Sequence, residues 1–201
     1  MLNISPPNIY VSQVDFFLLT TYSISKNNRQ LFISEKLLND STPSLLEAYL
    51  TLGLSHIKTK GSYKSSIAYC ITSIFLNITN QLDSLFSVIF GIHVDRKYIY
   101  RSPFSSLMSL FLYSFNFLFL TESTTEKSDK LSTVYCDTYS IEKALWNLQY
   151  YSVNIDYPLT LSSSILCILN PLAKEHWFKY LNYQYRIKNR LLNINGNYPI
   201  F

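Results

Sequence analysis

Residues 45–78, LLEAYLTLGLSHIKTKGSYKSSIAYCITSIFLNI, decide the fold that we expect for this chain. Apolar residues recur every three or four positions on both sides of a short basic turn at residues 58–62. That spacing is typical of amphipathic helices. The stretch therefore predicts two helices joined by a tight turn, and a chain built from such pairs would be all-α.

Small residues in this stretch indicate that the helices pack closely. Gly53 lies inside the first helix, where Gly costs about 1 kcal/mol relative to Ala. We expect it where a neighbouring helix comes too close for a side chain. The second helix places five large apolar residues on one face, Ile67, Ile71, Ile74, Phe75 and Ile78. Each helix should bury its apolar face against a neighbour.

The same stretch resembles a tetratricopeptide repeat, a helix–turn–helix unit of about 34 residues. The residues that carry the resemblance are Tyr49, Leu52, Gly53, His56, Gly61, Tyr63, Ser66, Ile67, Ser73 and Ile74. The family usually has Trp at the position of Tyr49, and Ala at those of Ser66 and Ser73. Weaker copies of the unit span residues 84–116 and 141–171.

The resemblance implies an all-α fold, a short irregular α-solenoid of antiparallel helix pairs in a single domain over residues 1–201. Residues 121–139 are polar and lack periodicity, so we expect a surface loop there. Residues 174–192 are basic and aromatic, and they should form a helix that caps the last repeat. Apolar spacing also predicts a helix over residues 5–24 and a shorter one that contains Leu31 and Leu37.

The composition supports a helical protein in a reducing compartment. The chain has only 4 Gly among 201 residues, and long helices need little Gly. Three widely spaced Cys residues form no C-x-x-C motif, which argues against a disulfide framework and against a zinc site. The prediction is an intracellular protein, in the nucleus or the cytoplasm.

No stretch of the sequence indicates enzymatic chemistry. His56, His93 and His176 are far apart in sequence and lack the spacing of metal ligands. The chain has no G-x-S-x-G motif, and its glycines are isolated, so nucleotide-binding loops are not expected. We therefore predict no catalytic residue, no cofactor and no metal.

The resemblance implies a non-enzymatic scaffold or adaptor subunit of a multiprotein complex. In that family the concave groove between first helices binds an extended or helical peptide. Its partners would be other protein subunits in a hetero-oligomer. The groove-facing residues implied by the resemblance are Glu47, Leu50, Thr51, Leu54 and Lys58 in the best repeat, and Lys143, Asn147 and Tyr150 in a later one.

Two alternatives remain open from the sequence. Residues 102–121 form an uncharged run of 20 residues, so the chain could be a membrane-associated helical subunit with this run inserted. The net charge of +4 also has a basic excess in residues 172–201, which contain five Lys and Arg and one Glu. A helical domain that binds nucleic acid, or another acidic partner, would use the basic residues Lys179, Arg186, Lys188 and Arg190.

Overall fold

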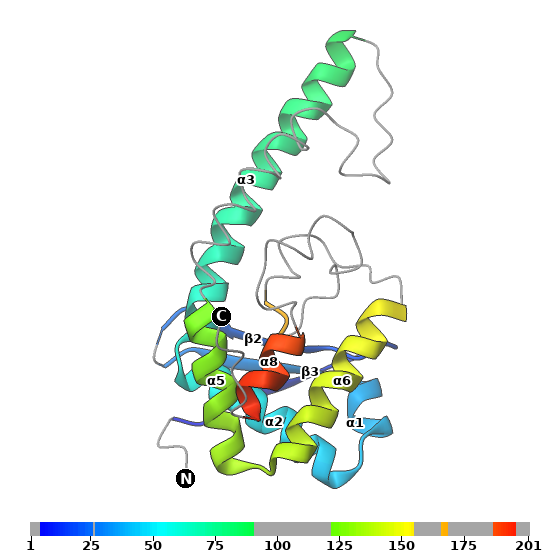
Figure 1. Ribbon diagram of the computed structural model, residues 1–201. Coiled ribbons are helices and arrows are strands. Elements are labelled where there is room, and N and C mark those ends of the chain that lie inside the picture. The colour runs from blue at the N-terminus through cyan, green and yellow to red at the C-terminus, as the bar shows by residue number, and fades with distance from the viewer. Residues whose placement is uncertain (1–4, 26, 91–121, 155–165, 169–186, 196–201) are drawn as a thin grey trace.

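The computed structural model describes residues 5–25, 27–90, 122–154, 166–168 and 187–195 (Figure 1). In chain order its elements are β1 (Asn8–Ser12), β2 (Leu19–Ser23), β3 (Arg29–Ser34), α1 (Glu35–Asp40), α2 (Pro43–Lys58), α3 (Gly61–Phe90), α5 (Glu122–Tyr135), α6 (Thr138–Asn154) and α8 (Ile187–Ile194). The described part of the chain is therefore mostly helical, with one small sheet that the sequence did not predict.

The sheet has the strand order β1-β3-β2, with β1 parallel to β3 and β2 antiparallel to it. The predicted helix over residues 5–24 is wrong, since β1 and β2 occupy half of it. Of the shorter helix predicted with Leu31 and Leu37, Leu31 lies in strand β3 and Leu37 in helix α1. Short runs such as Ile9-Tyr10-Val11 are β-branched and aromatic, and they fit helical and alternating spacing equally well. Pairing with β3 makes this run a strand. In β3 itself, the alternating residues Leu31 and Ile33 both face the core.

Ser34 ends β3 and starts α1. Its side chain accepts a hydrogen bond of 3.2 Å from the backbone N–H of Leu37 and another of 3.0 Å from that of Leu18. Helix α2 starts at Pro43, where a missing N–H costs nothing in a first turn. The two helices and the turn predicted in residues 45–78 are confirmed as α2 and α3. However, α3 continues to Phe90, so the first part of the predicted repeat at 84–116 belongs to it.

Residues 121–139 do not form a loop, because α5 covers most of them and α6 begins at Thr138. The inward face of α5 consists of the buried residues Thr124, Thr125, Ser128, Asp129 and Ser132. Hydropathy patterns cannot detect a helix that buries hydroxyl and carboxyl groups, which is why the polar composition was misleading. Only α6, residues 166–168 and α8 are described in the rest of the chain.

The predicted repeat at 141–171 contains α6, and its second helix falls mostly outside the described residues. Cys167, near the end of that repeat, forms a bridge with Thr20 at the edge of β2. The backbone N–H of Thr21 donates to the carbonyl of Leu166 at 3.2 Å, and that of Ile168 donates to Leu19 at 3.1 Å. This segment therefore extends the sheet. Of the expected capping helix at 174–192, the structure describes only the part in α8.

Helix α2 lies at the centre of the body and contacts β2, α3, α5 and α6. Its apolar side joins the sheet and α6 in one core, formed by Phe17, Leu19, Leu31, Ile33, Leu37, Leu45, Ala48, Tyr49, Leu52, Ile141, Ala144, Leu145, Leu148 and Ile168. Helix α3 starts in the body, and its C-terminal half extends beyond the other described elements (Figure 1). The described elements do not form the predicted solenoid of stacked helix pairs.

The small residues of the opening stretch face the sheet. A Cβ on Gly53 would lie 2.6 Å from Cδ1 of Leu31 in β3. The hydroxyl of Ser66 accepts a hydrogen bond of 2.8 Å from the backbone N–H of Ser23 in β2. The close approach predicted at Gly53 exists, but the neighbour is a strand.

Candidate functional site

The most exposed apolar surface in the described chain follows one side of α3. We call the α3 stripe the residues Ile71, Phe75, Ile78, Leu82, Leu85 and Ile89. Exposure rises along it, from half-buried Ile71 through Ile78 at 49% to Leu85 at 60% and Ile89 at 72%. The neighbouring Ile74 and Val88 are exposed as well. Contiguous apolar surface of this kind marks sites of interaction with protein or membrane.

The spacing of the α3 stripe is that of a helix that pairs with another helix. Its members follow one another at intervals of four, three, four, three and four residues. This alternation is the repeat of the a and d positions in a coiled coil, where apolar side chains insert between those of a facing helix. The stripe continues for five intervals, so a partner helix could contact it over about five turns.

The face that α3 buries is mostly small and polar. Its residues are Ser65, Ala68, Thr72, Leu76, Thr79 and Asp83. Hydroxyl groups on a helix can be buried at low cost when they bond to the carbonyls of the preceding turn. The Thr79 hydroxyl donates to the carbonyl of Leu76 at 3.0 Å, and the Ser66 hydroxyl donates to that of Ser62 at 2.7 Å. Helix α3 thus places its polar row inside and its large apolar row outside.

The flank beside the stripe is polar but uncharged. Asn77, Gln81 and Ser84 are exposed there. Lys64 and Asp83 are the charged residues in the sequence of α3. Charge would therefore contribute little to the choice of a partner helix along the α3 stripe, and apolar packing would decide which helix binds.

A second feature is a buried polar centre formed by His56, Thr21, Asp129 and Arg190. Nε and Nη2 of Arg190 donate to the two carboxylate oxygens of Asp129 at 2.8 and 2.6 Å. Nη1 donates to the carbonyl of Ile168 at 3.0 Å. Both side chains are at most 2% exposed, so this bidentate pair holds α8 against α5 in the interior.

His56 completes this centre from α2. Its Nδ1 lies 2.8 Å from the hydroxyl of Thr21 in β2, and its ring fills the space where a side chain on Gly61 would lie. Burial, helped by the positive charge of Arg190, lowers the pKa of His56 to about 4. Burial raises the pKa of the Asp129 carboxyl, and the Arg190 guanidinium opposes that rise. His56 is therefore neutral at pH 7, enclosed and far from the pKa of an effective general base.

Of the three free cysteines, Cys167 is buried, Cys136 is partly buried and Cys70 is exposed. Burial raises the pKa of the Cys167 thiol to about 12, which removes its nucleophilic form at neutral pH. In the described ranges no three His, Cys, Asp or Glu side chains are grouped so that they could hold a metal ion.

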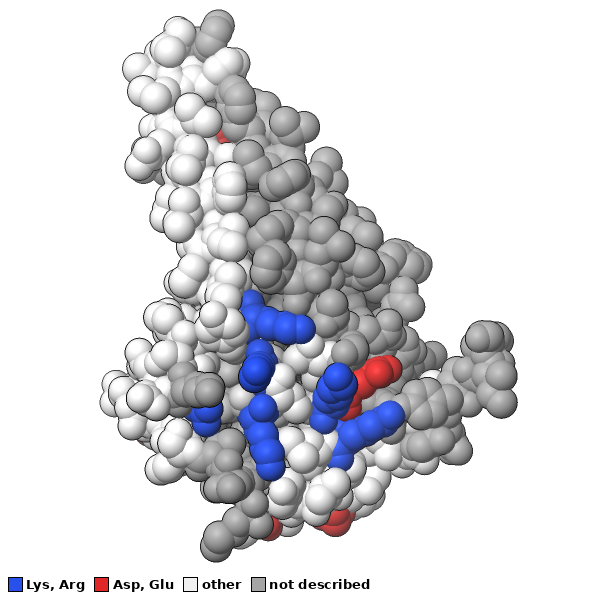
Figure 2. Space-filling model, turned by 90° about the vertical axis from the view of Figure 1, so that its left-hand side faces the viewer, with Lys and Arg blue, Asp and Glu red and all other residues white. Residues whose placement is uncertain are grey.

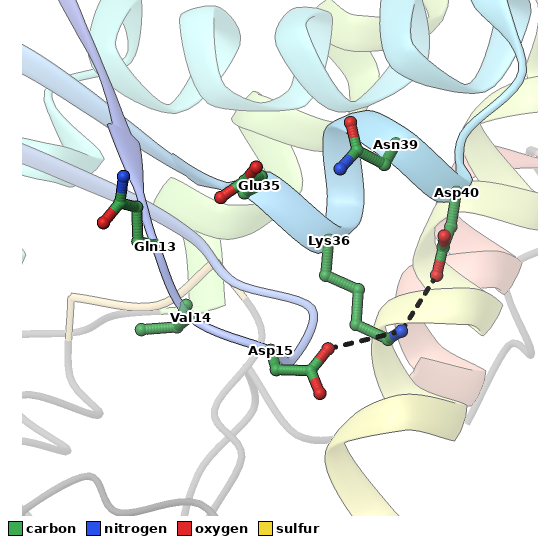
Figure 3. Close-up of a pocket in the computed structure, with 7 residues that line it drawn as sticks. All are labelled: Gln13, Val14, Asp15, Glu35, Lys36, Asn39 and Asp40. Carbon is green, nitrogen blue, oxygen red and sulfur yellow. Dashed lines mark ion pairs between the residues drawn. The ribbon is translucent and has the colours of Figure 1, made fainter.

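A shallow pocket lies between the β1–β2 connection and α1 (Figure 3). Its volume is about 260 Å³, below the size usual for small-molecule sites. Lys36 lies in it, with Nζ at 3.5 Å from Asp15 and 3.2 Å from Asp40. These two carboxylates raise the pKa of Lys36 and already neutralise its charge. The pocket thus offers no free cation to a ligand, and its three carboxylates, Asp15, Glu35 and Asp40, outnumber its single amine.

The predicted groove residues of α2 do not form one surface. Glu47 is exposed, Leu50, Leu54 and Lys58 are partly buried, and Thr51 is buried. Leu50 packs against the core, and the amine of Lys58 lies over the ring of Tyr135 in α5, 5.7 Å from its centre. Helices α5 and α6 cover α2, so no concave groove exposes its face in the described structure.

The predicted residues of α6 are likewise separate from the α3 stripe. Lys143 and Tyr150 are exposed, and Asn147 lies beside Tyr49, partly buried. Tyr150 packs edge to face on Tyr151, which stacks on Phe17 with ring centres 3.8 Å apart. An exposed Tyr150 is compatible with a contact surface, which stays a prediction.

The structure bears on the two alternatives from the sequence, nucleic-acid binding through C-terminal basic residues and membrane insertion of residues 102–121, to different extents. Arg190 is buried in its pair with Asp129, so it cannot contact nucleic acid. Lys179 and Arg186 lie outside the described residues, and so does the uncharged run at 102–121. For Lys188 the structure describes the helix but no side chain. Among the described helices, none combines the length and the apolar character needed to cross a bilayer.

Comparisons with protein-family models, with curated proteins and with solved structures found no match to this chain. The tetratricopeptide-like resemblance therefore depends on the residues of 45–78 alone. Sequence reasoning grouped Ile71, Ile74, Phe75 and Ile78 on one face but expected that face to be buried. The signal that it missed was the parallel row of Ser, Thr and Ala on the opposite face, which is the row that packs inward.

Proposed function

We propose that this protein is a non-enzymatic adaptor subunit that binds a helix of a partner protein along the α3 stripe. The observation that carries the proposal is a row of six apolar residues at coiled-coil spacing, five of them exposed, on a helix that extends from the body. A protein that left such a row in water permanently would expose a large apolar patch to aggregation. A partner helix removes that cost.

The expected interface is modest but sufficient for specific binding. The exposed parts of the stripe, with Ile74 and Val88, amount to roughly 500 Å² of apolar surface by order of magnitude. At about 25 cal/mol per Å², covering it contributes on the order of 10 kcal/mol before the costs of association. Stable interfaces bury about 800 Å² on each partner, so contacts beyond the stripe would add to it.

The proposal retains the adaptor function implied by the tetratricopeptide-like resemblance but moves the binding surface. A groove formed by first helices would use α2, whose faces are covered. The second helix of the same pair, α3, has the exposed apolar residues. Its partner should be a helix whose own apolar residues follow the four-three alternation, in a hetero-oligomer.

A cross-linking scan along α3 in cells that express the full chain tests this proposal. A photoreactive amino acid would replace Ile78, Leu82 or Leu85 in the stripe, and Asn77, Gln81 or Ser84 as matched positions on the polar flank. We expect one protein adduct of defined mass from the stripe positions and little from the flank. Equal adducts from both rows, or lipid adducts from the stripe, would contradict a partner helix.

A further inference from the structure

Five lysines gather on one face of the body, where the α2–α3 turn meets α5. We call the lysine patch Lys58, Lys60, Lys64, Lys127 and Lys130. Figure 2 shows basic side chains concentrated over this part of the molecule, with few acidic ones between them. Lys58 ends α2, Lys60 lies in the turn, Lys64 lies in the first turns of α3, and the other two lysines come from α5. Residues far apart in sequence are thus assembled into one positive surface.

Helix α5 presents its two lysines outward because its other side is fully engaged. Thr124, Thr125, Ser128, Asp129 and Ser132 face the interior. Lys127 and Lys130 are one turn apart on the opposite side, and both are exposed. Glu126 lies beside them in the sequence, and Asp129 of the same helix is paired inside with Arg190.

The lysines of the turn are held in place by the fold. The amine of Lys64 donates to the hydroxyl of Thr124 at 3.0 Å, and that of Lys58 lies over the Tyr135 ring. Lys60 has a φ of 62°, a left-handed conformation that favours Gly and is costly for Lys. It lies directly before the first residue of α3, so the positive end of the helix dipole adds to the same surface.

An aromatic side chain lies within this surface. Tyr63 directly precedes Lys64 in the first turn of α3, three residues after Lys60. Tyr63 is 43% exposed. A row of cations tracks a phosphate backbone, and an exposed aromatic ring offers a face on which a base can stack.

We infer that the lysine patch binds a single-stranded nucleic acid, with the lysines on successive phosphates and a base stacked on Tyr63. Tyr63 favours this ligand over an acidic protein or an anionic membrane, because neither of those offers a flat base to the ring. The site is separate from the α3 stripe, so it stands or falls independently of the proposed partner helix. It also replaces the predicted contact through Arg190, which is buried.

The test measures binding of a fluorescent oligo-dT and oligo-U of 20 nucleotides to the full chain by anisotropy, over a salt series. For single strands the logarithm of affinity falls by about 0.7 per phosphate contact for each unit of log salt, so four or five contacts predict a slope near −3. We expect Lys127→Glu with Lys130→Glu to weaken binding at least tenfold and to make the slope shallower by about 1.4.

Matched variants separate the patch from general charge and from stacking elsewhere. Lys143→Glu changes the charge as much as Lys130→Glu does, but at an exposed position of α6 that belongs to neither the patch nor the stripe. It should therefore weaken binding far less. Tyr63→Ala should weaken binding about fivefold or more without changing the salt slope, whereas Tyr139→Ala on exposed α6 should not. Far-UV circular dichroism verifies that each variant is folded.

Three results would overturn the inference. One is the absence of salt-dependent binding to either oligonucleotide at 50 mM salt. Another is equal loss from Lys130→Glu and Lys143→Glu, which would indicate net charge alone. The third is binding to vesicles of anionic lipid, or to a poly-glutamate peptide, with no binding to the oligonucleotides.

Discussion

Helices α2 and α3 bury opposite kinds of residues: α2 buries its apolar side, and α3 buries a polar row and exposes an apolar one. Helix α2 is covered on most sides: it packs on the sheet and α6 and also contacts α5 and α3, and Glu47 is one of its few exposed residues. Helix α3 instead buries Ser, Thr and Ala and exposes Ile, Leu and Phe. An amphipathic pattern therefore predicts a helix, but it does not show which face of that helix is buried. A helix with its polar row inside has an apolar row to offer to a partner.

The body contains a polar interior in which Asp129 pairs with Arg190 and His56 with Thr21, whereas, within the described residues, the buried hydroxyls of Ser55, Ser62 and Ser65 have no hydrogen-bond partner. Asp129, Arg190, His56 and Thr21 satisfy much of their hydrogen bonding within it. The α3 stripe has no such constraint, since an exposed side chain can be replaced with little effect on the fold. Substitutions in the body should therefore change the free energy of unfolding, and substitutions in the α3 stripe should change binding.

Breaking the Asp129–Arg190 pair should be the most destabilising change. Arg190→Met leaves a buried carboxylate without its partner, and we expect a loss of about 3 to 5 kcal/mol in the free energy of unfolding. Chemical denaturation measures it. The double variant Arg190→Met with Asp129→Leu should lose less than Arg190→Met alone, because no uncompensated charge remains. Additive losses would show that the pair is not coupled.

The buried His56 should make stability depend on pH. Its pKa is about 4 in the folded protein and 6.5 when unperturbed. Above pH 6.5 it is neutral in both states. As the pH falls from 6.5 towards 4, the unfolded chain binds a proton that the folded chain rejects, so stability is lost. From pH 7 to 5 this amounts to about 2 kcal/mol. In His56→Gln that part of the pH dependence should disappear, and an unchanged profile would contradict a buried neutral histidine.

The two glycines of the opening stretch should respond differently to a methyl group. A Cβ on Gly61 would overlap the enclosed ring of His56, so Gly61→Ala should cost about 1 to 3 kcal/mol. At Gly53 the nearest atom is a terminal methyl of Leu31, 2.6 Å away, which can shift. The gain in helix propensity, about 1 kcal/mol, offsets part of that cost. Thermal unfolding of both variants decides this, and a larger loss at Gly53 would refute the ordering.

Lys60→Gly should have the smallest effect on stability and the opposite sign. Relief of the left-handed conformation should raise the free energy of unfolding by up to about 1 kcal/mol. Lys60→Ala serves as the control, because it removes the same charge and keeps the strain. If both variants unfold at the same denaturant concentration, the conformation of Lys60 carries no cost.

Helices α2 and α3 were predictable from the sequence, but the strands and the helix α5 that pack against them were not. The periodicity of residues 45–78 predicted α2, the turn and α3 correctly. The strands at 8–12, 19–23 and 29–34 were missed because short runs such as Leu31 to Ile33 acquire their structure from distant partners. Helix α5 was missed because its buried face is formed by Thr, Ser and Asp129. The α3 stripe was seen as a face but placed inside, since spacing alone does not reveal what lies against a helix.

The most direct test of the partner helix compares two pairs of substitutions in α3. Leu82→Glu with Leu85→Glu adds two carboxylates to the stripe, and Gln81→Glu with Ser84→Glu adds the same charge on the exposed polar flank. The measurement is the affinity of each purified variant for the partner identified by cross-linking, together with its free energy of unfolding. We expect the stripe variant to lose about 3 kcal/mol of binding, roughly 100-fold, and to unfold like the flank variant. Equal affinity of the two variants, or unfolding of the stripe variant alone, would contradict the proposal.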